Sequence, residues 1–270
     1  MTKIGNGLFL KKDWQLPDYQ LFEFKRKHTK YCLCIPTLDE GERIKRQIKQ
    51  LKKYAETIDI LILDGGSSDG SMNKTFLKQN DVRSLLVKKS YGRQSTQLRM
   101  GFAYALKQGY QGIITMDGNG KDGIEQIPKF IEKFEKGYDY VQGSRFLKGG
   151  QAINTPPLRW WGIRFIISPI LSLTAKFWFT DVTNGFRAYS RRYLLHPKVK
   201  PFRDIFIKYE LLFYLPVRAG QLDLKITEIP VVRKYPKDKI PTKITGIRSH
   251  LDLFSTVLRV AFQEYNPKES

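Results

Sequence analysis

The sequence has few cysteines and few histidines, and both shortages exclude classes of protein. Its two cysteines, Cys32 and Cys34, lie two residues apart in one apolar run, where they would share one face of a strand and be poorly placed to bridge. A disulfide framework is therefore excluded, and a reducing compartment is expected. Three scattered histidines, with no ligand-spaced cysteine pairs, also argue against a structural zinc site.

Long hydrophobic runs are missing as well. The longest, residues 165–175, is interrupted by Pro169 and bounded by Arg164 and Lys176. Because a spanning helix needs about 20 apolar residues, this run is too short to cross a bilayer. Residues 1–30 contain no apolar segment typical of a signal peptide. We therefore expect a protein that is soluble or lies on a membrane.

Acidic residues are scarce relative to basic ones, since 26 Asp and Glu oppose 47 Lys and Arg, giving a net charge of +21. Such an excess favours anionic partners, namely phosphate-bearing ligands, a membrane surface or nucleic acid. Solvated lysines on helix faces are the alternative explanation. The hydrophobic content of 41% excludes disorder, and 270 residues suffice for one large α/β domain with an accessory region, or two domains at most.

Apolar runs alternate with helical patterns, including a helix predicted over residues 94–107. Near-continuous apolar strands between helices are typical of a mostly parallel central sheet flanked by helices on both faces. Such sheets bind ligands at the carboxyl ends of their strands. One polar strand end would be ordinary turn chemistry, but several along one sheet edge indicate a ligand site. We predict strands over 31–36, 58–63, 82–87, 112–116 and 138–142, with polar ends at 36–40, 64–66, 117–119 and 143–145.

The pattern changes after residue 150. Residues 181–235 are typical of a smaller α+β region, and residues 228–231 fit an edge strand because Pro230 cannot donate to a central ladder. The basic, proline-containing segment 233–243 predicts a surface loop. Residues 249–262 carry apolar side chains at helical spacing and predict an amphipathic C-terminal helix.

Asp117 and Asp64 are the carboxylates at two of these strand ends. Asp117 precedes two glycines that flank Asn119, and a carboxylate in such a place can ligate a hard cation that bridges a diphosphate; the alternative is a polar turn. Asp64 is suited to accept hydrogen bonds from a nucleotide base or ribose. No Walker lysine motif is present, and the glycines of residues 65–70 do not match the dinucleotide fingerprint, which argues against ATP hydrolysis and NAD binding.

Five segments in series resemble family 2 glycosyltransferases, in particular the polyprenyl-phosphate sugar synthases of the dolichol-phosphate mannose synthase group. Residues 35–40 (IPTLDE) resemble the P-T-Y-N-E opening, and residues 62–71 (ILDGGSSDGS) resemble the V-D-D-G-S-x-D-G-T element. Residues 115–119 (TMDGN) stand where the D-x-D motif lies. Residues 143–150 (GSRFLKGG) and 181–187 (DVTNGFR) resemble the later elements, so that the likeness covers residues 31–232.

The resemblance implies a GT-A fold and an inverting transfer of a sugar from a nucleoside-diphosphate sugar to a polyprenyl phosphate or another lipid-linked acceptor. It leads us to divide the chain into an N-terminal extension (1–30), a catalytic domain (31–235) and a basic loop with the C-terminal helix (236–270). Within the catalytic domain, residues 31–120 would bind the nucleotide and residues 121–235 the acceptor.

By matching position, the resemblance also implies roles for single residues. The resemblance implies that Arg145, Arg164 and Ser168 hold the acceptor phosphate, which is physically reasonable because arginine forks match phosphate oxygens. Arg187 would lie close to the diphosphate. Apart from the resemblance, Glu210 could orient the acceptor or act as base for a hydroxyl acceptor, and a buried capping role is the alternative. The implied nucleotide-sugar site comprises Pro36, Thr37, Glu40, Asp64, Asp117, Gly118, Asn119 and Lys121. The catalytic candidates are Asp117, Arg145, Asp181, Arg187 and Glu210.

The implied metal site departs from the family pattern. A divalent cation, Mg²⁺ or Mn²⁺, would be held by Asp117 and Asn119, with Asp122 as a further candidate ligand. Asn119 replaces the second aspartate of D-x-D, and since an amide is a weaker ligand than a carboxylate, metal affinity should be low. We hypothesise that Lys121 supplies part of the positive charge of the cation; a solvated loop lysine is the alternative.

Residues 159–180 combine Arg, Trp and Phe with apolar residues in helix-like pieces. This composition suits the interfacial zone of a membrane, with apolar side chains at the acyl boundary and cations at anionic headgroups. An oligomer interface or plain core is the alternative. We predict a cytoplasmic protein that binds peripherally to the cytoplasmic face of an anionic membrane.

Two other functions stay open from the sequence. One is transfer to a hydroxyl of a cell-surface polysaccharide or teichoic-type chain, which would need a base such as Asp181 or Glu210. The other is a non-catalytic protein that binds a nucleotide sugar or nucleic acid. The sequence contains no recognised nucleic-acid module, so nucleic acid is not expected as a partner.

Overall fold

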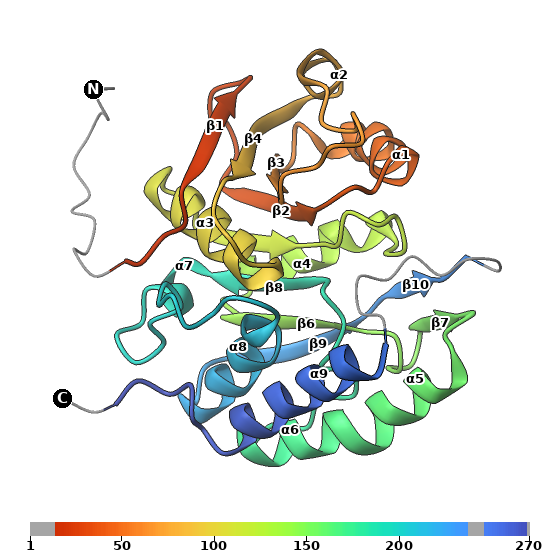
Figure 1. The fold of residues 1–270 in the computed structure, drawn as a ribbon, viewed down its shortest axis with the longest axis vertical. Helices are drawn as coiled ribbons and strands as arrows, with labels where there is room; N and C mark the ends of the chain where they lie inside the picture. The colour runs from red at the N-terminus through yellow and green to blue at the C-terminus, as the bar shows by residue number, and fades with distance from the viewer. Residues whose placement is uncertain (1–13, 237–245, 269–270) are drawn as a thin grey trace.

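The computed structural model describes residues 14–236 and 246–268. They form an α/β fold around an eight-stranded sheet, with a separate two-stranded sheet beside it (Figure 1). The order in the large sheet is β1-β4-β3-β2-β5-β8-β6-β9. Its strands are β1 (Tyr19–Glu23), β2 (Tyr31–Thr37), β3 (Asp59–Asp64), β4 (Val82–Lys88), β5 (Gly112–Thr115), β6 (Tyr140–Ser144), β8 (Arg187–Ser190) and β9 (Ile226–Pro230). The small sheet pairs β7 (Gln151–Ile153) with β10 (Val232–Lys234) in parallel.

The predicted mostly parallel sheet is confirmed in the nucleotide-binding half. Strands β4, β3, β2 and β5 are parallel neighbours, and every residue of β2 and β3 is buried. Side chains alternate between the two faces, so that Cys32 and Cys34 pack into one hydrophobic core while Leu33 and Ile35 pack into another. Both cysteines are buried free thiols.

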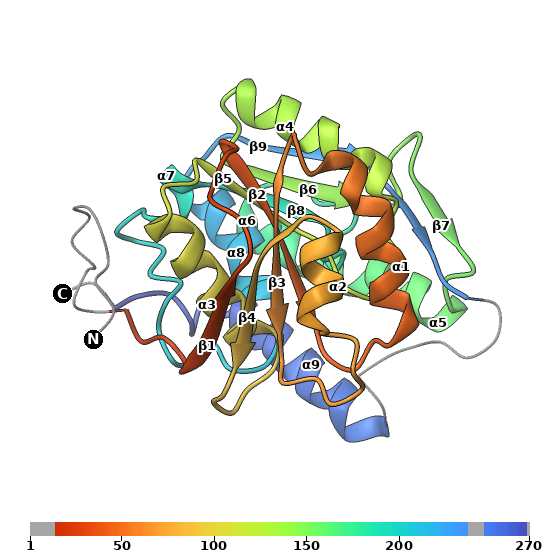
Figure 2. The same cartoon turned by 90° about the horizontal axis from the view of Figure 1, so that it is seen from above.

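Helices cover both faces of the sheet (Figure 2). On one face pack α1 (Glu42–Leu51), α2 (Lys74–Gln79) and α4 (Ile127–Glu135). On the other pack α3 (Gln94–Lys107), α6 (Ser168–Ala175) and α8 (Glu210–Gln221), with the short α7 (Arg191–Leu194). The helix predicted over residues 94–107 is confirmed as α3. The single-turn helices η1 (Lys52–Tyr54) and η2 (Ile124–Gln126) precede β3 and α4.

Two strands depart from the sequence prediction. Part of the N-terminal extension is β1, which pairs antiparallel with β4 and belongs to the main sheet. Strand β8 runs antiparallel between β5 and β6, so the acceptor half of the sheet is mixed. The predicted edge strand at Pro230 is confirmed, because β9 is the outermost strand at that end.

The aromatic segment forms a continuous helical stretch. Helix α5 (Pro157–Gly162) leads through the π-helical turn η3 (Ile163–Ile167) into α6. The predicted C-terminal helix is confirmed as α9 (Gly246–Ala261), which packs against α6 and α8. Residues 237–245 of the basic loop lie outside the described residues. Within the described parts of the chain, every helix is too short or too polar to span a membrane.

The contact between α6 and α8 is close enough to give a stability test. A Cβ at Gly220 of α8 would lie 1.9 Å from the carbonyl oxygen of Ala175 at the end of α6. We expect Gly220→Ala to lower the free energy of unfolding by about 1–3 kcal/mol, because backbone atoms must move apart. Urea denaturation measures the change.

Gly162 on α5 is the matched control, since a Cβ there meets nothing within 4 Å. Alanine at this position should be neutral or stabilising by up to about 1 kcal/mol, because glycine is the weaker helix former. Equal losses in the two variants would contradict the close approach of α6 and α8.

Candidate active site

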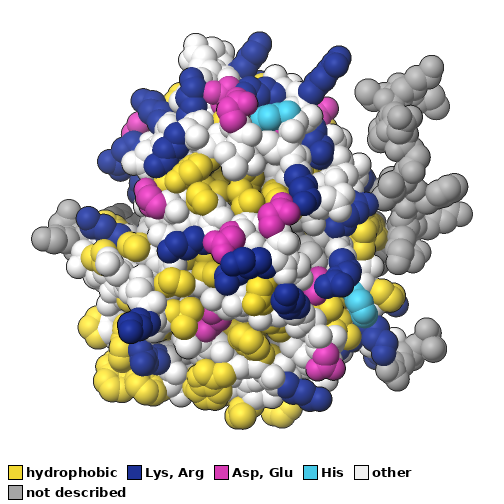
Figure 3. Space-filling view, turned by 180° about the vertical axis from the view of Figure 1, so that it is seen from behind, with side chains coloured by type: hydrophobic (Ala, Val, Ile, Leu, Met, Phe, Trp, Pro, Cys, Tyr) yellow, Lys and Arg dark blue, Asp and Glu magenta, His cyan; other side chains and the backbone are white. Residues whose placement is uncertain are grey.

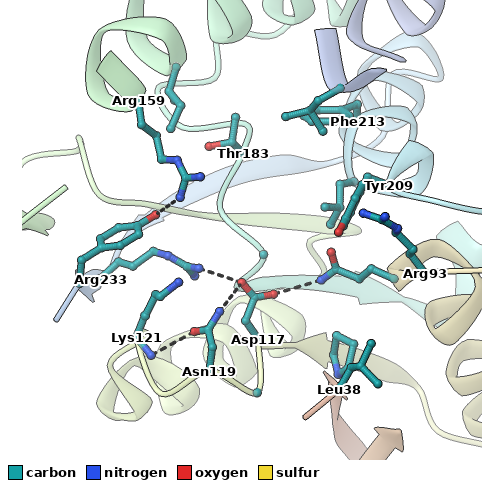
Figure 4. A pocket seen from close by; sticks show the side chains of 18 of the residues that line it. Leu38, Arg93, Asp117, Asn119, Lys121, Arg159, Thr183, Tyr209, Phe213 and Arg233 are labelled. Carbon is teal, nitrogen blue, oxygen red and sulfur yellow. Dashed lines mark hydrogen bonds and ion pairs between the residues drawn. The ribbon is translucent and has the colours of Figure 1, made fainter. Parts of the chain in front are cut away.

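The carboxyl ends of the parallel strands open onto one cavity of about 820 Å³. Its floor comes from the loops after β2, β3 and β5, and its far wall comes from α5, η3, α8 and α9. The floor is polar, whereas the far wall is largely apolar. Its lining includes Pro36, Thr37, Leu38, Glu40, Gly65, Arg93, Gln94, Gln97, Asp117, Gly118, Asn119, Lys121, Arg145, Leu158, Arg159, Ile163, Ile167, Tyr209, Leu212, Phe213, Arg233, Tyr235 and Leu253 (Figure 4).

Asp117 lies at the centre of the polar floor. Gln94 Nε2 donates to its Oδ1 at 3.1 Å, and the Arg233 guanidinium donates to its Oδ2 at 2.8 Å (Figure 4). Gly185 packs against the carboxylate so closely that a Cβ there would lie 2.6 Å from Oδ1. Burial alone would raise the pKa of Asp117, but the charges of Arg233 and Lys121 and these hydrogen bonds lower it below its usual value.

Arg233 joins two carboxylates. Its second nitrogen donates to both oxygens of Asp122 at 2.7 Å, and the Asp122 side chain has no exposed surface. The backbone fixes the same geometry, because Asp122 and Arg233 form an antiparallel bridge and Lys234 N donates to the carbonyl of Lys121 at 2.8 Å. Contacts of both its side chain and its main chain therefore fix the position of Arg233.

The predicted metal ligands do not fit a divalent cation in this arrangement. Each oxygen of Asp117 already accepts a hydrogen bond, both oxygens of Asp122 face Arg233, and Asn119 Nδ2 points to Asp117 Oδ2 at 3.5 Å. No group of three His, Cys, Asp or Glu side chains in the described ranges could hold a metal ion. The cation that contacts the Asp117 carboxylate is the guanidinium of Arg233.

Tyr235 is surrounded by cations. Its hydroxyl accepts a hydrogen bond from Arg159 at 3.2 Å, and Lys121 Nζ lies 4.8 Å from its ring centroid. Burial alone would raise the pKa of Tyr235, but Arg233, Arg145 and Arg159 lower it to about 8. This concentration of positive charge at the cavity is suited to bind phosphate oxygens.

Arg145 lines the cavity while forming a bidentate ion pair with Asp181, with nitrogen–oxygen distances of 2.6 and 2.8 Å. Both side chains are almost fully buried. Glu228 accepts hydrogen bonds from the backbone nitrogens of Thr180 and Asp181, and burial raises the pKa of Glu228 to about 7. Asp181 therefore positions Arg145, and its carboxylate is not directed into the cavity as a base.

At the opposite end of the cavity, Gln97 ties two strand ends together by donating to the carbonyls of Thr37 and Leu63 at 2.8 and 2.7 Å. Within the described residues, the buried hydroxyl of Thr37 has no hydrogen-bond partner. Glu40 lines the cavity beside Arg43, with which it forms an ion pair. Asp64 lies behind this lining, where its carboxylate accepts from the backbone and hydroxyl of Ser67.

Four further predicted residues do not line the cavity. Arg187 is fully buried, and its guanidinium donates to three backbone carbonyls. Its side chain therefore stabilises the surrounding backbone and does not face a ligand. Glu210 begins α8, and its carboxylate accepts from the backbone nitrogen of Lys208, which precedes the helix. Ser168 is buried and accepts from Val182 N at 3.3 Å. Arg164 is exposed and lies over the rings of Phe146 and Trp160.

Four residues of the site were not predicted: Gln94, Arg159, Arg233 and Tyr235. The prediction of a surface loop from residue 233 was wrong at its start, because Arg233 and Lys234 belong to β10 and Arg233 is buried. The sequence did signal charge in this segment. It gave no sign that Arg233 would pair with Asp122, in a loop more than a hundred residues earlier in the chain.

Residues 32–196 match the family described as Glycosyl transferase family 2. A polyprenol monophosphomannose synthase of Mycolicibacterium smegmatis is 27% identical over 167 residues, which cover 59% of this chain and 61% of the relative. An undecaprenyl-phosphate mannosyltransferase of Micrococcus luteus is 26% identical over 221 residues, which cover 78% of this chain and 88% of the relative.

Among solved structures, glucosyl-3-phosphoglycerate synthase of Mycobacterium tuberculosis superimposes with a TM-score of 0.63 at 14% identity, covering 86% of this chain and 80% of that one. That structure holds Mn²⁺, uridine diphosphate and glucosyl-3-phosphoglycerate. At this identity the likeness shows the fold alone. The chain therefore has the GT-A fold, with polar strand ends along one edge of its sheet. The chain belongs to glycosyl transferase family 2, and it is a glycosyltransferase.

The pKa of Tyr235 predicts how binding of a phosphate-bearing ligand changes with pH. Below about pH 8 the phenol is neutral, and above it a phenolate would compete with the ligand for Arg233, Arg159 and Lys121. We expect the affinity for uridine diphosphate to fall as pH rises from 7 to 9, by up to about tenfold. Isothermal titration calorimetry at each pH measures the change.

Tyr235→Phe is the control, because it keeps the ring and removes the titrating hydroxyl. The fall above pH 8 should disappear in this variant. If the fall persists unchanged, another group, such as Lys121, causes it.

Proposed function

We propose that this enzyme transfers a sugar, with inversion, from a nucleoside-diphosphate sugar to a polyprenyl phosphate or another lipid-linked phosphate at a membrane surface. One observation carries the proposal: a single cavity joins the predicted donor residues, a group of cations and an apolar wall. A lipid phosphate matches this arrangement, because its anionic head would lie against the cations and its apolar chain against the apolar wall.

The donor end supports a nucleotide sugar. Pro36, Thr37 and Gly65 line the cavity at two strand ends, and Asp117 and Lys121 lie toward its middle. We place the nucleoside near the strand ends and the diphosphate near Lys121 and Arg233. Asp64 would act indirectly, by holding the turn at Ser67 that shapes this end.

The acceptor end supports a phosphate rather than a hydroxyl. Arg145 and Arg159 line the cavity beside Ile163, Ile167 and Phe213. We therefore assign the acceptor phosphate to Arg145 and Arg159, whereas the predicted Arg164 and Ser168 lie outside the lining. A hydroxyl acceptor would need a base, and the candidate carboxylates Asp181 and Glu210 are engaged elsewhere.

The proposed reaction is a single displacement. An oxygen of the acceptor phosphate forms a bond to the anomeric carbon while the bond from that carbon to the diphosphate breaks, which releases the nucleoside diphosphate and inverts the configuration. The acceptor phosphate is already ionised, so no proton has to be removed. The residues would act by positioning the two substrates and by stabilising the charge on the leaving diphosphate.

The apolar wall of the cavity continues onto an exposed apolar surface, which we call the α5–α6 face. Its most exposed side chains are Leu158, Trp161, Phe165, Ile166, Leu173 and Trp178, and α9 adds Leu251 and Phe254 beside them. Hydrophobic side chains gather along the corresponding edge of the molecule (Figure 3). We propose that this face lies on the cytoplasmic surface of a membrane, where the exposed Arg164 meets anionic headgroups.

The acceptor assignment is tested by comparing two neighbouring arginines. We expect Arg159→Gln to raise the KM for a short-chain polyprenyl phosphate by about 10- to 100-fold, since it removes a charged hydrogen-bond donor from the cavity. Arg164→Gln should change it by less than about threefold. The assay follows labelled sugar from UDP-, GDP- and CDP-sugars into lipid extract, and circular dichroism confirms that both variants fold.

Equal effects in the two variants would contradict the assignment to Arg159. Transfer to a polysaccharide hydroxyl, with none to the polyprenyl phosphate, would contradict the lipid-phosphate acceptor itself.

The membrane proposal is tested on the α5–α6 face. We expect Trp161→Ser combined with Phe165→Ser to weaken binding to phosphatidylglycerol vesicles by at least about tenfold, because two exposed aromatic rings no longer enter the interface. Flotation measures the bound fraction. Leu21→Ser in β1, at the opposite end of the sheet, is the control and should bind as the wild type does. Wild-type protein that does not float with these vesicles would refute the proposal.

A further inference from the structure

Arg233 occupies the position at Asp117 that the D-x-D resemblance assigns to a divalent metal. We propose that Arg233, assisted by Lys121, is a built-in cation that neutralises the donor diphosphate, so that the donor binds without a divalent metal. This inference rests on the proposed function in one respect, namely that the donor carries a diphosphate.

The geometry supports a permanent cation. The Arg233 guanidinium lies within 2.8 Å of Asp117 on one side and of Asp122 on the other, and 7% of the residue is exposed. It also lines the cavity, as does Lys121. The two terminal nitrogens of the guanidinium are therefore each anchored by a carboxylate, while the residue itself borders the space where we place the diphosphate.

The charges of the cluster balance without a metal. Asp117 and Asp122 contribute two negative charges, and Arg233 and Lys121 contribute two positive ones, so the sum is zero. A divalent cation held by two aspartates gives the same sum. In the site without nucleotide, a metal bound in addition would leave two positive charges in excess beside Arg233 and Lys121, and these like charges would repel.

Displacing Arg233 would also be costly. Its main chain bridges Asp122, and the neighbouring Lys234 donates to the carbonyl of Lys121, so the side chain cannot leave by a shift of β10 alone. A guanidinium withdrawn from the buried Asp122 and the partly buried Asp117 would leave both carboxylates without this cation. Asn119, the remaining predicted ligand, is neutral and offers little in exchange.

The experiment measures nucleotide binding directly. Isothermal titration calorimetry with UDP, GDP and CDP is performed on the full chain in EDTA and again in Mn²⁺. For the wild type we expect the nucleotide that binds best to show the same Kd in both buffers, within about twofold. For Arg233→Gln we expect a loss of about 10- to 100-fold in EDTA, because a buried charged contact is removed.

The same variant should acquire a metal site. Without the guanidinium, Asp117 and Asp122 lose the cation that they share, and Mn²⁺ should restore much of the lost nucleotide affinity. Electron paramagnetic resonance of free Mn²⁺ gives a readout that needs neither nucleotide nor turnover. Arg233→Gln should deplete the free Mn²⁺ signal at concentrations where the wild type does not.

Lys234→Gln is the matched control, since it removes one positive charge from the adjacent, exposed position of β10. It should bind nucleotide as the wild type does in both buffers. If Arg233→Gln does not fold, the double change Arg233→Gln with Asp122→Asn removes the buried cation together with Asp122, the fully buried one of its two carboxylate partners. That variant should fold and bind nucleotide weakly in EDTA.

The outcomes separate this inference from the proposed function. Wild-type nucleotide binding that requires Mn²⁺, or wild-type depletion of free Mn²⁺ equal to that of Arg233→Gln, would overturn the built-in cation while leaving the donor intact. Failure of all three nucleotides to bind in either buffer would contradict the diphosphate donor, and with it this inference.

Discussion

The contact of Arg233 with Asp117 and Asp122 is the interaction on which the site depends. Two neighbouring carboxylates, the fully buried Asp122 and the partly buried Asp117, are unfavourable unless a cation compensates them, and here the cation comes from a distant strand. Pairing it requires β10 to run beside the loop that follows β5. The same pairing brings Tyr235 and its surrounding cations to the cavity. Arg233 therefore links the polar floor of the cavity to its acceptor end.

Much of the fold could be predicted from local patterns. Continuous apolar runs identified the buried parallel strands, and helical spacing identified α3 with both of its ends. The ends of β2, β3 and β5 were correctly expected to meet, because parallel strands in neighbouring positions finish at one edge. Most of the implied donor residues therefore line the cavity, including Thr37, Asp117 and Lys121.

What could not be predicted depends on contacts between distant residues. The antiparallel placement of β8 turns Arg187 into the core, although its motif alone is compatible with a ligand role. Arg145 and Asp181 were predicted separately, but their bidentate pairing appears only when β6 and the loop before β8 are adjacent. A motif places a residue at the end of a strand, whereas the direction of its side chain is decided by partners elsewhere in the chain.

The position of β1 has a consequence for solubility. An outermost strand offers unpaired backbone groups to other molecules, and β4 would be such a strand if β1 did not cover it. At the other end of the sheet, β9 finishes in Pro230, which lacks a donor for further pairing. A chain shortened to begin at β2 would therefore expose the backbone edge of β4 to edge-to-edge aggregation, even though all the residues that line the cavity would remain.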